Sequence, residues 1–289
     1  MTRTDRIPLG LSTFVLASPF SDDDLQLLAK ARAWGYDHVE VCIEDPSLLK
    51  ASAVARAASD EGLNVLVCGA FGPQRDVSHE DAGMRSAARD YLMHCVEFAH
   101  EVGSPLVSGP MYATTGQARL LEPVERQAQW DRAVQGLRQV GEAAAAAEVT
   151  LAVEPLNRFE TDLVNTVEQG VRLCEDIGLA NVGLMLDTFH MNIEEKSLPR
   201  AIVAAGTHIV NFQVSENDRG TPGTGHTPWA EVIAALRAVG YPGGVVVESF
   251  LPTVKEIAKA VSLWRPVAPS MDALAGDSVE FLHPLLAST

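Results

Sequence analysis

Four short stretches of the chain combine carboxylates with side chains that bind metals or carbonyl groups. They are VEPLNRFET with Glu154 and Glu160, LDTFH with Asp187 and His190, FQVSENDR with Gln213 and Arg219, and VVVES with Glu248. Three carboxylates and one amide oxygen form a hard, oxygen-rich ligand set, which suits Mn²⁺, Mg²⁺ or Co²⁺ better than metals that prefer thiolates. We therefore predict one divalent metal site made by Glu154, Asp187, Gln213 and Glu248. Without a cation, three carboxylates held together would repel one another or become protonated.

Such a site indicates a particular reaction. A divalent ion that bridges a ketone oxygen and the adjacent hydroxyl polarises the carbonyl and stabilises an enediolate, which eases removal of the proton on the neighbouring carbon. Two carboxylates on opposite faces of that carbon could take the proton from one side and return it from the other. Glu154 and Glu248 are the candidates for this pair, and the reaction would be an epimerisation.

Three of the predicted ligands are followed, within six residues, by a second polar side chain: Glu160, His190 and Arg219. These groups suit the carbonyl end of a polyhydroxy substrate, because Arg219 can donate to oxygens as a fixed fork. The simpler interpretations are a helix cap or ligand support for His190, and a salt bridge to Glu160 or Glu216 for Arg219.

The elements that must position these residues alternate along the whole chain. Short apolar runs predict strands at 9–15, 38–43, 63–68, 105–108, 150–154, 182–187, 209–214 and 244–248, and amphipathic or alanine-rich runs predict helices that begin near residues 22, 46, 80, 123, 165, 194, 229 and 254. Eight such pairs predict an α/β fold, the (β/α)₈ TIM barrel, in which reactive groups collect at the C-terminal ends of the strands. A doubly wound open sheet is the main alternative, although no GxGxxG follows the first strand.

No linker or low-complexity tract divides the 289 residues. We predict one barrel domain over residues 1–265, followed by an extension at 266–289 that packs on the barrel or on a subunit interface. The formal net charge of -16 repels phosphate backbones and anionic lipids, so neither nucleic acid nor a membrane is an expected partner.

The four cysteines are widely spaced and lie in apolar or helical contexts: Cys42, Cys68, Cys95 and Cys174. We expect reduced, buried thiols of a cytoplasmic protein. The N-terminal residues lack an apolar signal core, and no apolar run reaches the roughly 18 residues that a membrane span requires.

Three motifs carry a family resemblance. VEPLNRFETDLVNT, VGLMLDTFHMNIEEKS and SENDRGTPGTGH resemble the ketose 3-epimerase branch, of the D-tagatose and L-ribulose 3-epimerase type, within the xylose isomerase-like TIM barrels. The resemblance implies a bound Mn²⁺, with Co²⁺ or Mg²⁺ as alternatives, and reversible inversion at C3 of free ketoses. By motif, Glu154 and Glu248 correspond to the acid/base pair that also binds metal, and Asp187 to a third ligand.

The resemblance also assigns a substrate pocket. It implies that Glu160, His190 and Arg219 bind the sugar near its carbonyl, and that Cys68, Gly109 and Tyr112 lie where the family lines the pocket. It further implies a homodimer or homotetramer.

One position departs from the family pattern, because Gln213 stands where the family has a metal-binding histidine. An amide oxygen is a weaker donor than imidazole, so the metal or the reaction could differ. Enzymes acting on 3-oxo sugars, inososes or 3-oxo glycosides, including the catalytic subunits of C-glycoside-cleaving enzymes, therefore remain an alternative. A non-catalytic sugar-binding barrel is a second alternative. A nuclease resembling endonuclease IV fits poorly, because it needs a histidine-rich zinc site and a basic face.

Overall fold

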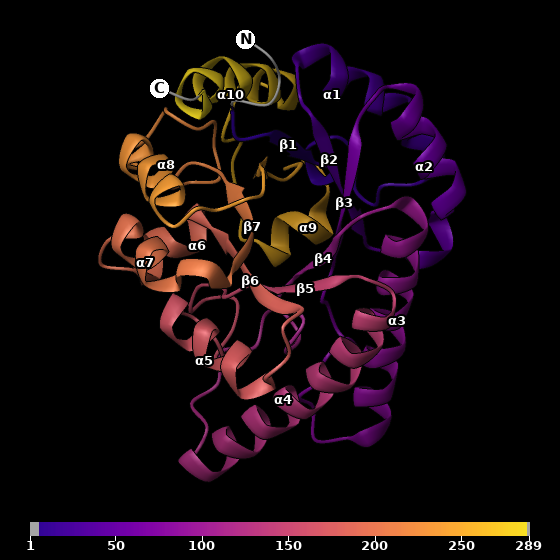
Figure 1. Ribbon diagram of the computed structural model, residues 1–289, viewed down its shortest axis with the longest axis vertical. Coiled ribbons are helices and arrows are strands. Elements are labelled where there is room, and N and C mark those ends of the chain that lie inside the picture. The colour runs from indigo at the N-terminus through magenta and orange to yellow at the C-terminus, as the bar shows by residue number, and fades with distance from the viewer. Residues whose placement is uncertain (1–5, 288–289) are drawn as a thin grey trace.

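Eight parallel strands close into a barrel, and a ring of helices surrounds it (Figure 1). The structure is a computed structural model that describes residues 6–287. The strands are β1 Leu9–Ser12, β2 His38–Ile43, β3 Asn64–Gly69, β4 Leu106–Gly109, β5 Thr150–Val153, β6 Val182–Asp187, β7 Ile209–Val214 and β8 Val245–Val247. Each strand pairs with its neighbour in chain order, and β8 pairs with β1 to close the barrel. The predicted TIM barrel is confirmed.

The helices follow the strands in the expected alternation. They are α1 Leu28–Trp34, α2 Ala51–Asp60, α3 Ala82–Val102, α4 Pro123–Ala146, α5 Val167–Ile177, α6 Thr188–Glu194, α7 Leu198–Ala205, α8 Trp229–Ala238, α9 Lys255–Ala260 and α10 Met271–Leu286, with 3₁₀ turns η1 Thr13–Val15, η2 Asp22–Leu27, η3 Pro46–Leu48 and η4 Gly206–His208. None of the helices within residues 6–287 combines the length and the apolar character that a bilayer-spanning segment requires.

Two helices differ from the sequence-based expectation. The helix expected near residue 194 begins earlier, at Thr188, because Asp187 ends β6 and also caps α6 by accepting a hydrogen bond from the Phe189 N–H at 2.8 Å. After β8 the chain first forms the short α9, which lies near the barrel centre in Figure 1. The longer α10 then completes the outer ring between α1 and α8.

α10 comes from the segment predicted to be an extension, of which residues 288 and 289 lie outside the described part. Leu274 and Leu282 of α10 are fully buried. Tyr36 Oη donates to the Ala275 carbonyl at 2.8 Å, and the Ile7 N–H donates to the Leu286 carbonyl at 3.1 Å. The start and the end of the described chain are therefore joined at one side of the barrel.

The strands are apolar on both faces because side chains pointing inward fill the barrel and those pointing outward pack on helices. The four cysteines are free and buried. The imidazole of His38 lies close to two glycines: a Cβ on Gly10 would come within 2.2 Å of the ring, and one on Gly244 within 2.4 Å. Both positions must therefore lack a side chain.

Candidate active site

Four of the predicted residues emerge where strands β5 to β8 end. Glu154 and Glu248 follow β5 and β8 directly, and their backbone N–H groups continue the sheet pairing by donating to Gly109 and Val214, each at 3.1 Å. Asp187 is the last residue of β6, and Gln213 in β7 is its Cα partner across the sheet. Closure of the barrel therefore brings these positions to one rim, as the sequence predicted.

Arg219 lies among the carboxylates. Its Nη1 donates to Oδ2 of Asp187 and to Oε2 of Glu248, the latter at 2.8 Å. Phe189 and Phe250 hold rings 4.1 and 5.1 Å from the guanidinium carbon, and such faces favour a cation. The side chain is therefore a buried positive charge, held by two carboxyl groups and two aromatic rings.

The backbone of the β7–α8 loop aims Arg219 into the site. Its φ of 68° is uncommon for a residue with a side chain. The Arg219 N–H donates to the Glu216 carbonyl at 2.9 Å, and Ser249 Oγ donates to the Arg219 carbonyl at 2.7 Å. The Glu216 carboxylate accepts from the Thr227 N–H and from the Trp229 indole, both at 2.9 Å. These bonds hold the loop in a conformation that would otherwise be unfavourable.

His190 is held as a neutral ring. Its Nδ1 accepts from the backbone N–H of Asn157 at 3.1 Å, and Nη2 of Arg219 lies 3.0 Å from its Nε2. Nε2 lies 3.5 Å from Glu154 Oε1 and 3.8 Å from Asp187 Oδ2. Burial, followed by the nearby charge of Arg219, lowers the pKa of His190 well below its usual value. The side-chain amide of Asn157 donates to Glu160 at 2.8 Å and so joins the two substrate-binding candidates.

Crowding of the acids changes their protonation. Burial, followed by repulsion from Glu248 and Asp187, raises the pKa of Glu154 well above its usual value. Burial likewise raises the pKa of Glu248 to about 8, although Arg219 opposes this change. A carboxyl group with a pKa of about 8, such as Glu248, can both release and accept protons near neutral pH.

Gln213 is fully buried and uses only one end of its amide. Its Nε2 donates to Oε2 of Glu40, at 2.5 Å, whereas its Oε1 has no hydrogen-bond partner among the described residues. A buried acceptor without a partner costs about 1–3 kcal/mol. An added cation ligated by this oxygen would remove the penalty.

The donor set suits a divalent metal ion. Glu154, Asp187 and His190 each offer one ligand atom, and these three atoms lie within 4.8 Å of one another. All three residues are buried. Gln213, which pairs with Asp187 in the sheet, offers a further oxygen without a hydrogen-bond partner among the described residues. Carboxylate and amide oxygens with one imidazole are donors that suit Mn²⁺ or a similar ion. His190 can therefore serve as a ligand as well as the substrate-binding group that the sequence suggested.

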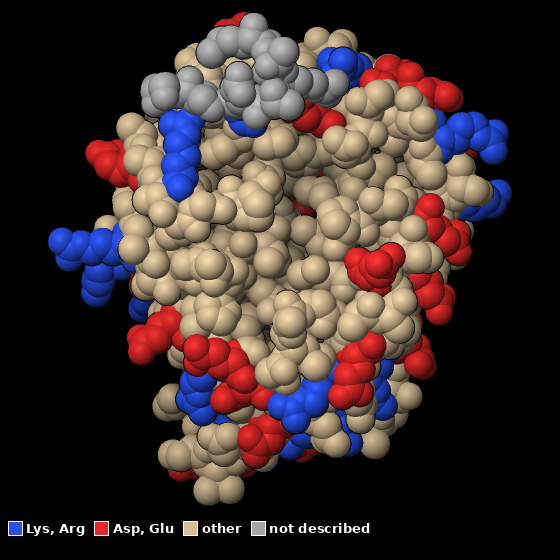
Figure 2. Space-filling view, in the orientation of Figure 1, with Lys and Arg blue, Asp and Glu red and all other residues tan. Residues whose placement is uncertain are grey.

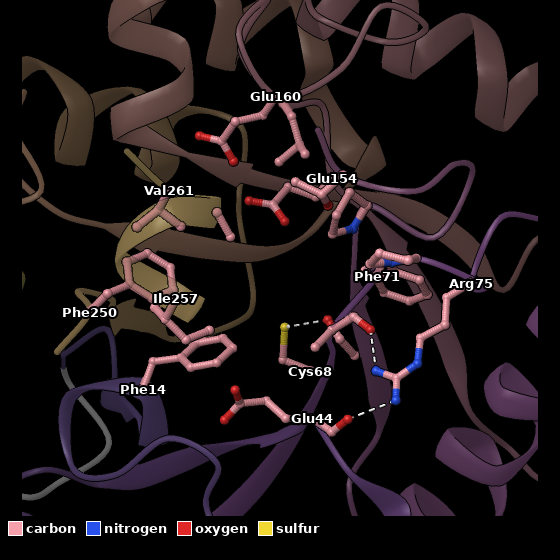
Figure 3. A pocket seen from close by; sticks show the side chains of 18 of the residues that line it. Phe14, Glu44, Cys68, Phe71, Arg75, Glu154, Glu160, Phe250, Ile257 and Val261 are labelled. Atoms are coloured by element: carbon pink, nitrogen blue, oxygen red, sulfur yellow. Dashed lines mark hydrogen bonds between the residues drawn. The ribbon is translucent and has the colours of Figure 1, made fainter. Parts of the chain in front are cut away.

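A cavity of about 640 Å³ opens onto this group. Glu154, Glu160, His190, Arg219 and Glu248 form its polar side. An apolar side made by Phe14, Phe250, Ile257 and Val261 lies across from Glu154 and Glu160, which point into the cavity (Figure 3). Phe71, Glu44 and Arg75 also border the cavity. On the face viewed in Figure 2, charged side chains lie mainly toward the periphery and the centre is largely uncharged.

The three other residues predicted to line the pocket lie at different depths in the barrel. Cys68 lines the cavity, but Gly109 and Tyr112 are not among its described lining residues. Tyr112 is fully buried, and its hydroxyl donates to the Val164 carbonyl at 3.0 Å. Gly109 has a φ of 126°, and a Cβ there would lie 2.9 Å from the Gly69 carbonyl oxygen. Gly109 also lies against Phe71 of the cavity lining, because a Cβ there would come within 2.8 Å of that ring.

Sequence reasoning missed the residues that support the site. Phe189 and Phe250 had no signal, because aromatic residues after apolar strands are common. Glu216 was considered only as a partner for Arg219. Glu40 did carry a signal, since it is a lone charge between Val39 and Val41 in an otherwise apolar strand.

Comparison with known proteins assigns this barrel to a family. Residues 28–281 match the family model described as xylose isomerase-like TIM barrel. The chain belongs to this family. It is 33% identical to a probable ketose 3-epimerase of Synechocystis sp., over 98% of each chain. It is 34% identical to the L-ribulose 3-epimerase of Mesorhizobium japonicum, over 95% of this chain and 92% of that one.

The match to a solved structure supports the same family assignment. A structure of L-ribulose 3-epimerase superimposes with a TM-score of 0.91 at 32% identity, covering 98% of this chain and 95% of the other. The family resemblance deduced from the motifs is thus confirmed along nearly the whole chain, and with it the relation to carbohydrate epimerases.

Proposed function

We propose that this protein is a metal-dependent ketose 3-epimerase of the cytoplasm. The observation that carries the proposal is the position of Glu154 and Glu248 at one rim, both buried, both lining the cavity and both with raised pKa values. The ketose 3-epimerase names of the full-length relatives support the same reaction class.

Side chains of this protein move the proton. The proton on C3 of a ketose is acidic because it lies next to the C2 carbonyl. One of the two glutamates removes it, and the other, in its protonated form, delivers a proton to the opposite face. Arg219, His190 and Glu160 orient the carbonyl end of the sugar, and burial of the site excludes water that would compete for these groups.

We propose that Glu154, Asp187, Gln213 and Glu248 hold the metal, with Mn²⁺ as the expected ion and Co²⁺ or Mg²⁺ as alternatives. A bound dication supplies positive charge that favours the enediolate over the neutral ketose. His190, close to Glu154 and Asp187, provides a further donor.

Solvent exchange tests the proposal directly. Purified protein supplied with Mn²⁺ in deuterated water should place deuterium at C3 of fructose, tagatose or ribulose while forming the C3 epimer. Nuclear magnetic resonance follows both changes in one sample. If no free ketose exchanges its C3 proton, the proposed function is wrong.

A second candidate acts on 3-oxo sugars or 3-oxo glycosides. The cavity volume of about 640 Å³ falls in the range of pockets that enclose drug-sized ligands, and the apolar side offers a surface for an aglycone. A 3-dehydro-D-guloside 4-epimerase of Escherichia coli is 32% identical over 39% of this chain. Turnover of 3-oxo glycosides without turnover of free ketoses would favour this candidate.

We also propose that the protein forms a homodimer or homotetramer. Three large apolar side chains are exposed on the β4–α4 and β5–α5 connections and at the start of α4: Leu120, Val124 and Phe159. Exposed apolar groups of this kind favour association. Light scattering should therefore give at least twice the mass of one chain, and Phe159→Asp should lower it.

A further inference from the structure

A buried carboxylate crosses the barrel below the proposed metal site. Glu40 lies in β2, is fully buried, and reaches β7, although β1 and β8 separate these two strands in the barrel. Its Oε2 accepts from Gln213 Nε2 at 2.5 Å, and its Oε1 accepts from Asn211 Nδ2 at 2.8 Å and from Ser108 Oγ at 3.1 Å. All three donors are neutral side chains, so Glu40 is not paired with a cation through these contacts.

The contact with Glu40 determines the orientation of the Gln213 side-chain amide, whose nitrogen faces Glu40. An amide presents two N–H donors at one end and an oxygen acceptor at the other. A carboxylate accepts hydrogen bonds, so it attracts the nitrogen end and repels the oxygen end. The Gln213 oxygen must therefore point away from Glu40, and it has no partner among the described residues.

The position of Gln213 in the sheet turns its side chain to the same side as that of Asp187. Gln213 is the Cα partner of Asp187, and neighbouring partners in parallel strands point their side chains to the same side. Asp187 in turn belongs to the group with Glu154 and His190 whose ligand atoms lie within 4.8 Å of one another. Without an anion at position 40, the amide could equally present its nitrogen, which cannot ligate a cation.

We propose that Glu40 is a positioning residue, which holds the Gln213 amide so that its oxygen, and not its nitrogen, is available to the metal. Glu40 itself touches neither metal nor substrate. Its function is to make glutamine a usable ligand at this position. The inference rests on the proposed metal site, but it is tested by affinity and not by catalysis.

The test measures Mn²⁺ affinity of the metal-free full-length protein by titration calorimetry. Glu40→Gln preserves shape but removes the charge that selects one amide orientation. Loss of a group that orients a ligand typically lowers metal affinity by about 10–100-fold, and we expect a loss of this size. The matched control is Ser108→Ala, which removes another hydrogen bond to Glu40 but leaves Gln213 held, so its affinity should stay within about twofold of the wild type.

A double-mutant cycle separates positioning from general support of the fold. In a Gln213→Ala background there is no amide to orient, so Glu40→Gln should cause no further loss of affinity. The exchanged pair E40Q/Q213E provides a second variant if E40Q alone does not fold. There the amide at position 40 can donate to one oxygen of the carboxylate at position 213 while the other oxygen stays free, so affinity should equal or exceed that of the wild type.

The outcomes are distinguishable. If the wild type and E40Q bind Mn²⁺ equally well, the positioning role is wrong while the metal site stands. The same conclusion follows if Glu40→Gln lowers the Mn²⁺ affinity by the same factor in the wild type and in the Gln213→Ala background. Failure of the exchanged pair to bind would also overturn it. If the wild type itself binds no Mn²⁺, the metal site fails together with this inference.

Discussion

Nη1 of Arg219 lies 2.8 Å from Oε2 of Glu248, in a place where both side chains are more than nine-tenths buried. The same nitrogen also contacts Asp187. Burial opposes the charged guanidinium, but the nearby carboxylates outweigh it and raise the pKa of Arg219. A candidate base is thus held in place by a permanent cation before any substrate arrives.

Replacing Arg219 by lysine should impair catalysis even though the charge remains. Lysine cannot reproduce the planar fork that reaches Asp187, Glu248 and His190 together, and hydrogen bonds to charged groups contribute about 1.5–3 kcal/mol each. We expect kcat/KM for the ketose to fall by about tenfold to a hundredfold. Arg158→Lys is the matched control, because Arg158 makes a similar two-point contact with Glu194 but its side chain is exposed. Equal losses in both variants would contradict a specific role for Arg219.

Replacing Glu154 or Glu248 by glutamine should abolish C3 proton exchange from different epimers. Glu248→Gln should slow epimerisation by about 10²–10⁴-fold, because an amide can neither take nor return the proton. One epimer should nevertheless still exchange its C3 proton, through Glu154. Glu154→Gln should retain exchange of the opposite epimer. Nuclear magnetic resonance of both epimers in deuterated water distinguishes them, and loss of exchange from the same epimer in both variants would contradict the two-base assignment.

Gln213→His should tighten metal binding. Imidazole is a stronger donor than an amide oxygen, and its second nitrogen can still donate to Glu40. We expect Mn²⁺ affinity to rise on the order of tenfold, or about 1.4 kcal/mol, in calorimetric titration. Unchanged affinity would remove residue 213 from the ligand set.

Metal should also stabilise the folded protein. Mn²⁺ at about 100 times its Kd adds about 2.7 kcal/mol, which for a chain of this size raises Tm by several degrees. Asp187→Asn should reduce the rise, because asparagine still caps α6 but lacks the charge. Thermal melts with and without Mn²⁺ measure the difference, and an equal rise in both proteins would place the ion elsewhere.

Acid should destabilise the barrel through His38. Burial lowers the pKa of His38 to about 4, against about 6.5 for an exposed histidine. Because the unfolded chain binds this proton first, stability contributed by His38 is complete above pH 6.5 and is lost as the pH falls toward 4. Between pH 7 and pH 5 the contribution of His38 alone to stability should fall by about 2 kcal/mol.

Urea unfolding of the wild type and of His38→Gln at both pH values measures this loss as the difference between the two proteins. The effect of Glu154 and Glu248, whose raised pKa values act in the opposite direction, is common to both. The variant should lack the loss, because glutamine does not titrate in this range, whatever its effect on absolute stability. If His38→Gln unfolds with the same pH dependence as the wild type, His38 is not the group responsible.

Local sequence patterns were sufficient to predict the barrel and its rim. Apolar runs interrupted by helical patterns specify strands buried on both faces, and the carboxylates directly after these runs must lie at one end of a parallel barrel. Helix boundaries were less certain, as α6 illustrates. There Asp187 serves both as the end of β6 and as the helix cap, a double role that a pattern of hydrophobicity does not reveal.

By itself, the sequence determined the architecture, the family and the chemical types of the acidic residues, because these depend on neighbours along the chain. Only the tertiary structure decided that Arg219 lies between Asp187 and Glu248, and that Glu40 holds Gln213 from 173 residues away. Such contacts form across the barrel interior once it closes. Their energies depend on burial and on distances between strands, neither of which is encoded in any single stretch of residues.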